Sequence, residues 1–222
     1  GYEFDGMLLW HERRFSVHLN SRKGNTVESN RGRFTLAHEL GHYFIDSHRE
    51  GIRRGVLPPH PSNSSLVHTD KMEAEADYFA ACLLMPRERL RRFTGRRKFS
   101  LDIIRHISEE FGVSLTAAAL RFAEVGTHEV MVVFSEGSRV SWFYRSPDFP
   151  LLANRFKVGQ QLPPTSVAGE SLLKSDARYT GVEFVDLEDW FFDRRGAPTR
   201  QLYEQCFYSD MYGYVISLLW FE

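Results

Sequence analysis

The sequence predicts an α+β protein in which a mixed N-terminal part is followed by a smaller, strand-rich C-terminal part. Residues 7–10 and 15–19 are predicted to be short strands, and the second alternates between apolar and polar at Phe15, Val17 and Leu19. Two amphipathic segments, residues 31–48 and 69–86, have the spacing of helices. From residue 129 the apolar pattern changes to a period of two, which indicates a second group of strands.

Length and composition are typical of a soluble, folded protein. The 222 residues are 42% hydrophobic and 14% aromatic, which is enough apolar material for one large core or two smaller ones. The formal net charge of −1 gives no general attraction to nucleic acid or membranes. Cys82 and Cys206 are far apart in sequence, so we expect no disulfide framework and a cytoplasmic, reducing location. We expect no signal peptide, and the apolar end at residues 214–221 is too short to span a bilayer.

The most informative segment is residues 31–48, RGRFTLAHELGHYFIDSH, which carries His38, Glu39 and His42 in the spacing HExxH. Residues four apart on a helix lie one turn above each other, so both imidazoles can bind one metal ion. Glu39 lies about 100° round the helix, where it can contact a metal-bound water instead of the metal. The alternative is a surface helix with two solvated histidines.

Apolar residues at helical spacing support the helix, and Gly41 keeps bulk away from the position before the second histidine. This expected apolar face consists of Phe34, Ala37, Gly41 and Phe44.

A catalytic zinc site needs a third protein ligand and an open fourth position. His48 stands six residues after His42, as in the pattern HExxHxxGxxH. However, Ile45 occupies the place of the glycine that breaks the helix in that pattern, and a β-branched residue lacks the freedom of glycine. If the helix continues, His48 lies about 9 Å further along it and is turned away.

The second candidate ligand, Glu73, lies in residues 69–86, TDKMEAEADYFAACLLMP. This segment is predicted to be a helix that is capped near Thr69 or Asp70 and ended by Pro86. Its expected buried side consists of Met72, Ala76, Phe79, Ala80 and Leu83.

Glu73 and Asp77 share one face of this helix. Glu73 can therefore bind the metal while Asp77 holds the far N–H of a ligand histidine. Two alternatives remain open at this point: Glu73 closes a capping box with Asp70, or Glu75, which points about 200° away from Glu73, is the ligand.

The two blocks RFTLAHELGH and EAEADYFAACLLMP together resemble the ImmA/IrrE metallopeptidases of bacteria and their mobile elements, over about residues 1–125. In that family RxxxAHExxH is followed by ExxAN or ExxAD and then by xFAxxLLMP. The resemblance implies a zincin-like, gluzincin-type domain in which His38, His42 and Glu73 bind Zn²⁺, with Mn²⁺ as another divalent candidate. It also implies that Glu39 is the catalytic acid/base. Asp77 stands where many members carry Asn, and it keeps a hydrogen-bonding role.

The resemblance further implies a substrate class. Members of the family cleave helix-turn-helix repressor or antitoxin proteins, which relieves repression in stress, DNA-damage, mobile-element or defence responses. The alternatives are a non-catalytic sensor or binding partner with a peptidase fold, and a general cytoplasmic peptidase. The intact Glu39 argues against the first, because a purely structural metal site has no use for a general base.

We expect a metallopeptidase domain over residues 1–127, which includes helix-turn-helix-like helices at 100–122, and a C-terminal α+β domain over 128–222. The second of those helices has few polar groups that can read base edges, so we expect the pair to pack and not to bind DNA. Hairpins are predicted at residues 130–144 and 201–221. By analogy with IrrE, the C-terminal domain is expected to be GAF-like and to have a sensing or regulatory role.

Three weaker features complete the sequence. Residues 87–98 hold seven basic side chains and one acid, which favours a solvated face or, alternatively, a surface for single-stranded DNA as an activator. His60 and His68 are candidates for stabilising an oxyanion, although we favour exposed loop histidines. Cys206 is either a small core residue or a thiolate that regulates the metal.

Overall fold

The computed structural model describes residues 4–57, 62, 70–95, 97–171, 179–192, 198–209 and 213–222. The chain divides into two compact units: Gly1–Phe93 with Arg105–Ala118, and Thr94–Ile104 with Ala119–Glu222. This division runs through two helices, α5 (Leu101–Phe111) and α6 (Leu115–Val125). The sequence pattern instead places the domain boundary between residues 127 and 128, where the second group of strands begins. That boundary stays a prediction.

The first unit begins with an antiparallel hairpin of β1 (Gly6–His11) and β2 (Arg14–Leu19), as predicted. The two turn residues, Glu12 and Arg13, have φ values of 47° and 63°. This left-handed geometry matches the twist of the strands in a two-residue hairpin turn, although glycine or asparagine adopts it more easily. The hairpin packs on helix α1 (Asn30–Phe44).

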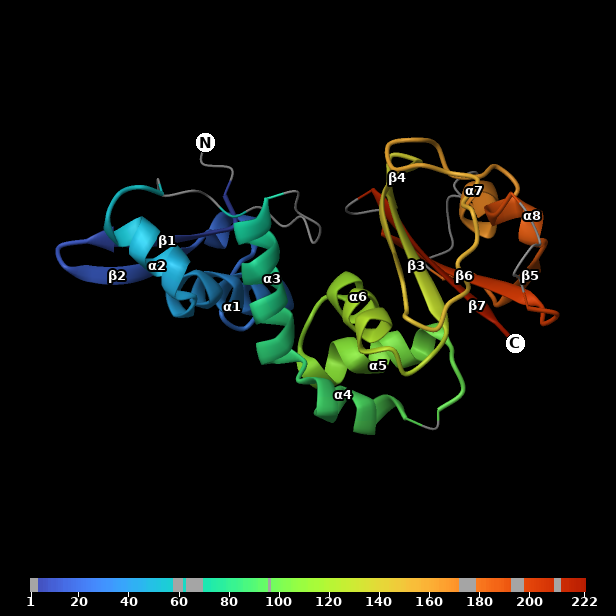
Figure 1. Cartoon of the computed structure of the whole chain (residues 1–222), viewed down its shortest axis with the longest axis horizontal. Helices are drawn as coiled ribbons and strands as arrows, with labels where there is room; N and C mark the ends of the chain where they lie inside the picture. The colour runs from blue at the N-terminus through green and yellow to red at the C-terminus, as the bar shows by residue number, and fades with distance from the viewer. Residues whose placement is uncertain are drawn as a thin grey trace. The chain divides into compact units, whose positions relative to one another are not determined.

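Helices α1 and α3 (Lys71–Leu84) both begin at side-chain caps. The Ser29 hydroxyl accepts a hydrogen bond from the third residue of α1, and the Asp70 carboxylate accepts one from the second residue of α3. The two helices pack against each other (Figure 1). The remaining helices of this part of the chain are η1 (Ser21–Lys23), α2 (Asp46–Arg53) and α4 (Arg87–Thr94). Among the described residues, no helix is both long and apolar enough to cross a membrane.

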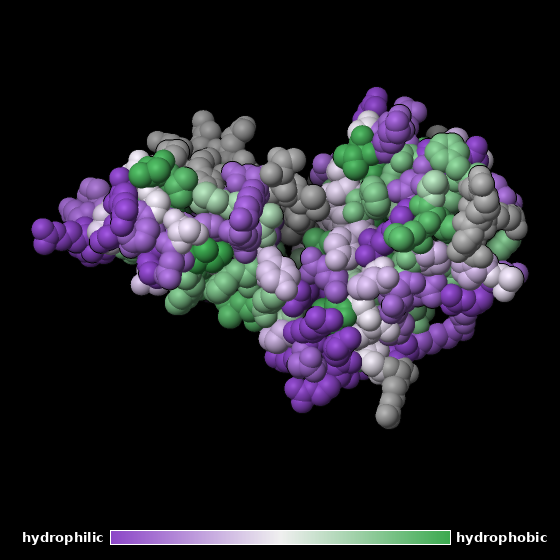
Figure 2. All heavy atoms as spheres, viewed as in Figure 1, coloured by the Kyte–Doolittle hydropathy of each residue, from purple (hydrophilic) through white to green (hydrophobic). Residues whose placement is uncertain are grey.

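Two residues expected in the core lie at the surface. Phe44 is 58% exposed and Leu83 is 51% exposed. Phe44 is the last residue of α1, and its ring stacks on Phe79 at a centroid distance of 5.9 Å, so these rings cover each other. Leu83 lies in the last turn of α3. Figure 2 shows hydrophobic surface over α1 and the end of α3. Helical spacing predicts which face a residue lies on, but it cannot show where along the helix the covering element stops.

The second unit is built on an antiparallel sheet of five strands in the order β4-β3-β7-β6-β5. The predicted hairpins are observed as the neighbouring pairs β3–β4 and β6–β7. The strands are β3 (Val130–Glu136), β4 (Arg139–Arg145), β5 (Glu183–Val185), β6 (Leu202–Ser209) and β7 (Tyr214–Phe221). One face packs on the short helices α7 (Val167–Ser171) and α8 (Leu187–Trp190).

A buried carboxylate joins this sheet to the two short helices. Glu204 on β6 is 0% exposed and accepts four hydrogen bonds. The donors are the backbone amides of Val167 (2.9 Å) and Ala168 (3.0 Å), the Trp190 indole (2.8 Å) and the Cys206 thiol (3.2 Å). Each carboxylate oxygen serves two of these donors. Both side-chain atoms at these two positions of residue 204 must therefore be hydrogen-bond acceptors.

Glu204→Gln should destabilise the protein, because the amide NH₂ would face two donors whichever way it is flipped. Two buried donors would lose their acceptor, which lowers the free energy of unfolding by about 2–4 kcal/mol. Denaturant unfolding followed by tryptophan fluorescence measures the change. The matched control is Glu136→Gln at the exposed end of β3, which should change the value by less than about 0.5 kcal/mol. Equal stability of the two variants would show that the network contributes nothing.

Candidate metal centre

Helix α1 holds two histidines on its buried side, one turn apart. His38 and His42 are each 3% exposed, and their Nε2 atoms lie 3.1 Å apart. Such a short distance between two ring nitrogens is unfavourable unless a proton or a metal ion lies between them or beside both, because two lone pairs repel. The pair therefore indicates a shared cation.

Helix α3 brings a carboxylate to the same point. Glu73, 6% exposed, places Oε2 at 3.4 Å from His38 Nε2 and Oε1 at 3.1 Å from His42 Nε2. One candidate ligand atom from each of the three residues lies within 4.8 Å of the others. The close approach of the two helices depends on Gly41, because a Cβ there would lie 3.1 Å from Ala76 Cα.

These distances fit a tetrahedral metal ion. Bonds of about 2.0–2.1 Å to nitrogen or oxygen at tetrahedral angles require ligand atoms about 3.3 Å apart. The Nε2 atoms of His38 and His42 are 3.1 Å apart, near that value, and Glu73 places one oxygen 3.4 Å from the first and its other oxygen 3.1 Å from the second. Two imidazoles and a carboxylate form a donor set of catalytic zinc sites, and three protein ligands leave the fourth position for water or substrate.

Asp77 orients one of the two imidazoles. It lies one turn after Glu73 on α3, and His38 Nδ1 donates a hydrogen bond of 2.8 Å to Asp77 Oδ1. This bond directs Nε2 of the same ring toward Glu73. Burial lowers the pKa of His38, but hydrogen bonds with Asp77 and Glu73 and the charges of Asp77 and Glu39 outweigh burial and raise the pKa to about 10. Without a metal, His38 therefore holds a proton at neutral pH.

Glu39 lies beside the centre, and its environment is specific. It is 1% exposed, and its Oε1 accepts a hydrogen bond of 2.6 Å from the Ser62 hydroxyl. Gly6 on β1 lies against the same oxygen, because a Cβ on Gly6 would be 2.8 Å from Glu39 Oε1. A buried carboxylate next to a metal-ligand histidine is suited to proton transfer.

His48 lies in a place that the helical projection did not predict. Helix α1 ends at Phe44, because Ile45 adopts an extended conformation with φ −79° and ψ 112°, and α2 then begins at Asp46. This turn brings the buried His48 ring to a centroid distance of 5.2 Å from His42. The condition under which His48 would point away, a helix that continues past Ile45, is therefore not met: breaking this helix required only extended φ and ψ, which β-branched residues favour, and no glycine.

His48 is nevertheless bonded elsewhere. Its Nε2 lies 3.0 Å from Glu75 Oε2, and it is absent from the group of three candidate ligands. Burial lowers the pKa of His48 more than Glu75 raises it, so the ring is neutral and donates this hydrogen bond. Glu75 lies outside the group of three candidate ligands that contains Glu73, as its position about 200° away on the helix predicts.

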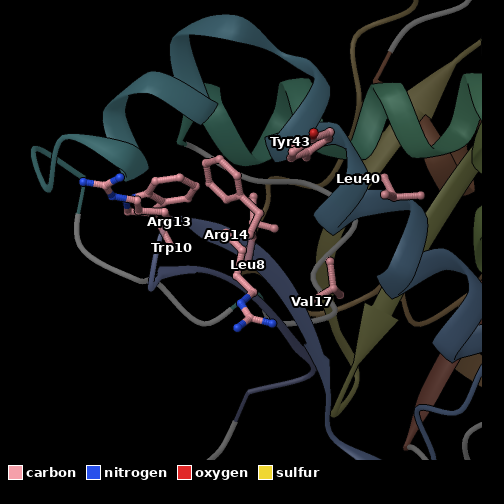
Figure 3. A pocket seen from close by; sticks show the side chains of 8 residues that line it. Leu8, Trp10, Arg13, Arg14, Val17, Leu40 and Tyr43 are labelled. Atoms are coloured by element: carbon pink, nitrogen blue, oxygen red, sulfur yellow. The ribbon is translucent and has the colours of Figure 1, made fainter.

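A pocket of about 400 Å³ opens between the β1–β2 hairpin and α1 (Figure 3). Its walls are mostly apolar and aromatic, and two arginines stand at the turn of the hairpin. The lining residues are Leu8, Trp10, Arg13, Arg14, Phe15, Val17, Leu40 and Tyr43. Leu8 and Trp10 of β1 line this pocket, whereas Gly6 of the same strand is bridged to Ser62 and lies against Glu39.

Comparison with known proteins identifies the family. Residues 5–123, more than half of the chain, match the peptidase family described as the IrrE N-terminal-like domain. The chain belongs to this family. The match covers both blocks of sequence that hold the IrrE-like centre, with His38, Glu39, His42 and Glu73 inside it.

A search of curated proteins found no match. Among solved structures, the chain is similar to a Mycobacterium tuberculosis transcriptional regulator, with a TM-score of 0.54 and 14% sequence identity. The match covers 86% of this chain and 56% of that one, so this chain spans little more than half the length of that protein. At this identity the likeness shows the fold alone, and it extends beyond the IrrE N-terminal-like domain.

No sequence pattern indicated that Gly6 or Ser62 lies next to Glu39 in this candidate metal centre. Ser62 is in the same loop as the two candidate histidines, His60 and His68, which lie outside the described residues. Cys206 is fully buried in the sheet of the second unit, where its thiol contacts Glu204 and Ser217, which agrees with a core residue.

Zinc binding should depend strongly on pH. The pKa of His38 is raised to about 10, so zinc must displace a proton from this imidazole near neutral pH. The proton competes less as the pH rises, so the apparent affinity should increase about ten-fold per pH unit between pH 6 and 8. Competition with a chromophoric chelator measures this slope. Asp77→Asn removes the charge that raises the pKa of His38 and should flatten the slope. A wild-type affinity independent of pH would contradict the assignment.

Substitution of the candidate ligands should separate Glu73 from His48. Glu73→Ala should reduce zinc affinity more than about 100-fold, and Asp77→Ala should reduce it by about 10- to 100-fold through the loss of His38 orientation. His48→Ala should keep the wild-type affinity, because His48 is bonded to Glu75. The reverse result for Glu73 and His48 would make His48 the third ligand. Zinc content after dialysis and unfolding curves for each variant complete the measurement.

Proposed function

We propose that this chain is a zinc-dependent endopeptidase that cleaves a helix-turn-helix transcriptional repressor or antitoxin at a specific site. Cleavage would relieve repression in a stress, DNA-damage, mobile-element or defence response. The observation that carries the catalytic part is the convergence of His38, His42 and Glu73, whose candidate ligand atoms lie within 4.8 Å of one another, with Glu39 buried beside them. A structural metal site would need four protein ligands and no adjacent general base.

The residues divide the chemistry among them. His38, His42 and Glu73 would hold the metal, and Asp77 fixes the orientation of His38. Zinc, when bound, supplies a Lewis acid that polarises the scissile carbonyl and activates water. Glu39 accepts the proton of the attacking water and then passes it to the leaving nitrogen. Burial of all these groups excludes bulk water, which strengthens their electrostatic interactions.

The substrate class rests on the family resemblance. It is supported by the similarity to a protein described as a transcriptional regulator, although that likeness establishes only the fold. Repressors and antitoxins act in the cytoplasm, so we propose a cytoplasmic location. The pocket between the β1–β2 hairpin and α1 is the proposed site for an apolar side chain of an extended segment of such a substrate.

We further propose that the C-terminal part, residues 128–222, senses the signal and is GAF-like, by analogy with IrrE alone. Single-stranded DNA is a proposed activator. Its candidate surface is α4, where Arg87, Arg91 and Arg92 are exposed and Figure 2 shows hydrophilic surface. Arg89 is not available to the same extent, because it pairs with Glu110 at 2.6 Å and lies over the Phe111 ring.

Glu39→Gln should keep zinc and substrate binding but lose cleavage by about 100- to 10,000-fold, because the amide cannot accept the proton. The assay incubates the zinc-loaded protein with a helix-turn-helix repressor or antitoxin that its gene neighbourhood is found to encode, and counts the fragments by mass spectrometry. One or a few cuts that disappear with a chelator support the regulatory peptidase.

Three other results would contradict this function. An active Gln variant would exclude Glu39 as the base. Extensive digestion of unfolded proteins would indicate a general peptidase. Binding of the repressor without any cut in the zinc-loaded wild type would indicate a non-catalytic sensor.

A further inference from the structure

Ser62 is tied to the first strand by main-chain hydrogen bonds. Its amide donates to the Gly6 carbonyl at 3.1 Å, and its carbonyl accepts from the Asp5 amide at 2.8 Å. These bonds form an antiparallel bridge between Gly6 and Ser62. Ser62 is 5% exposed, so its side chain is held in the interior next to α1.

The Ser62 hydroxyl has one proton and two acceptors within reach. Glu39 Oε1 lies at 2.6 Å and the Gly6 carbonyl oxygen at 3.0 Å. A charged acceptor forms the shorter and stronger bond, so the proton points to the Glu39 carboxylate. The hydroxyl therefore holds one defined oxygen of the catalytic acid/base.

Gly6 confines the same oxygen from a second side. A Cβ at Gly6 would lie 2.8 Å from Glu39 Oε1 and 2.4 Å from Thr35 Cγ2, so the carboxylate fits against this strand only because residue 6 is glycine. The terminal torsion of a glutamate is otherwise broad. Contact with both Ser62 and Gly6 restricts the carboxylate to one orientation.

We propose that Ser62 is a positioning residue of the peptidase reaction, whose hydroxyl orients Glu39 for proton transfer. This rests on the proposed function, in which Glu39 is the acid/base. Ser62 itself does not touch the reacting atoms. Its effect comes from geometry, since small displacements of a proton-transfer group reduce rates strongly.

The test compares Ser62→Ala with Ser62→Thr, which restores a hydroxyl on a residue type that strands favour. The matched control is Ser16→Ala on β2, whose hydroxyl lies 3.2 Å from His18 and not near Glu39. All variants are loaded with zinc, and their zinc content and thermal unfolding are checked first. The variants are then compared in two measurements: binding of a metal-chelating inhibitor and cleavage of a substrate.

The first readout is binding of acetohydroxamic acid to the zinc-loaded protein by calorimetry. A hydroxamate chelates the metal and gives its proton to a neighbouring carboxylate, so its affinity reports on Glu39. Ser62→Ala should weaken binding about ten-fold, while Ser62→Thr and Ser16→Ala should match the wild type. Unchanged binding in Ser62→Ala would overturn the positioning role while zinc binding and the proposed function stand.

The second readout is cleavage of the same helix-turn-helix repressor or antitoxin. Ser62→Ala should lower kcat about 10- to 100-fold at an unchanged KM, and Ser62→Thr should recover most of the loss. If Ser62→Ala instead lowers KM or raises kcat/KM, Ser62 occupies the edge that the substrate needs, and the proposal is overturned. If the wild type itself cleaves nothing, the proposed function fails, and the hydroxamate arm alone decides whether Ser62 orients Glu39.

Discussion

The close contact between α1 and α3 is the constraint on which the centre depends. Two of the three candidate metal ligands lie on one helix and the third lies on the other, so their spacing is set by how closely the helix backbones approach. A Cβ at Gly41 would lie 3.1 Å from Ala76 Cα and 3.2 Å from its carbonyl oxygen. These separations are so tight that a side chain at Gly41 would push the helices apart and widen the 3.1 and 3.4 Å ligand separations. The close backbone approach at Gly41 thus sets the spacing of the candidate ligands and with it their fit to a metal ion.

The centre also gathers three acidic side chains, Glu39, Glu73 and Asp77, around His38. Glu39 and Glu73 are buried, and Asp77 is largely so. Buried carboxylates are unfavourable unless opposite charges or hydrogen-bond donors compensate them. In the protein without metal, the proton on His38 offsets one charge, which is why its pKa rises to about 10. A divalent ion would offset two charges, so the electrostatics of the site favour metal binding over the protonated state.

Much of the centre could be predicted from local sequence, because its main contacts follow helix periodicity. The four-residue spacings of His38 with His42 and of Glu73 with Asp77 predicted which side chains share a face, and the caps and Pro86 predicted the extent of α3. Helix periodicity failed where the helix ended. Ile45 adopts extended φ and ψ, and the turn into α2 returns His48 to the interior. A rotation of about 100° per residue carries no information on such a break.

Long-range contacts were not predictable in the same way. Ser62 reaches Glu39 through a main-chain bridge to Gly6, 56 positions away in sequence, and no local pattern specifies that pairing. Glu204 likewise obtains its donors from α7 and α8, which the alternation of β6 does not reveal. Strand alternation predicts that residue 204 lies on one face of a sheet, and it cannot predict that the facing layer presents N–H groups.

Glu204 and Glu39 are both buried, but they differ in what holds them. Glu204 receives two backbone amides, an indole and a thiol, which all belong to the packed interior and bind both oxygens. Moving that carboxylate would break the contact between sheet and helices, so its role is to hold them together. Glu39 instead follows a metal-ligand candidate in sequence, and a serine hydroxyl on a single bridge holds its Oε1. A carboxylate whose Oε1 is held next to three candidate metal ligands has a fixed direction, as proton transfer at an open metal position would require.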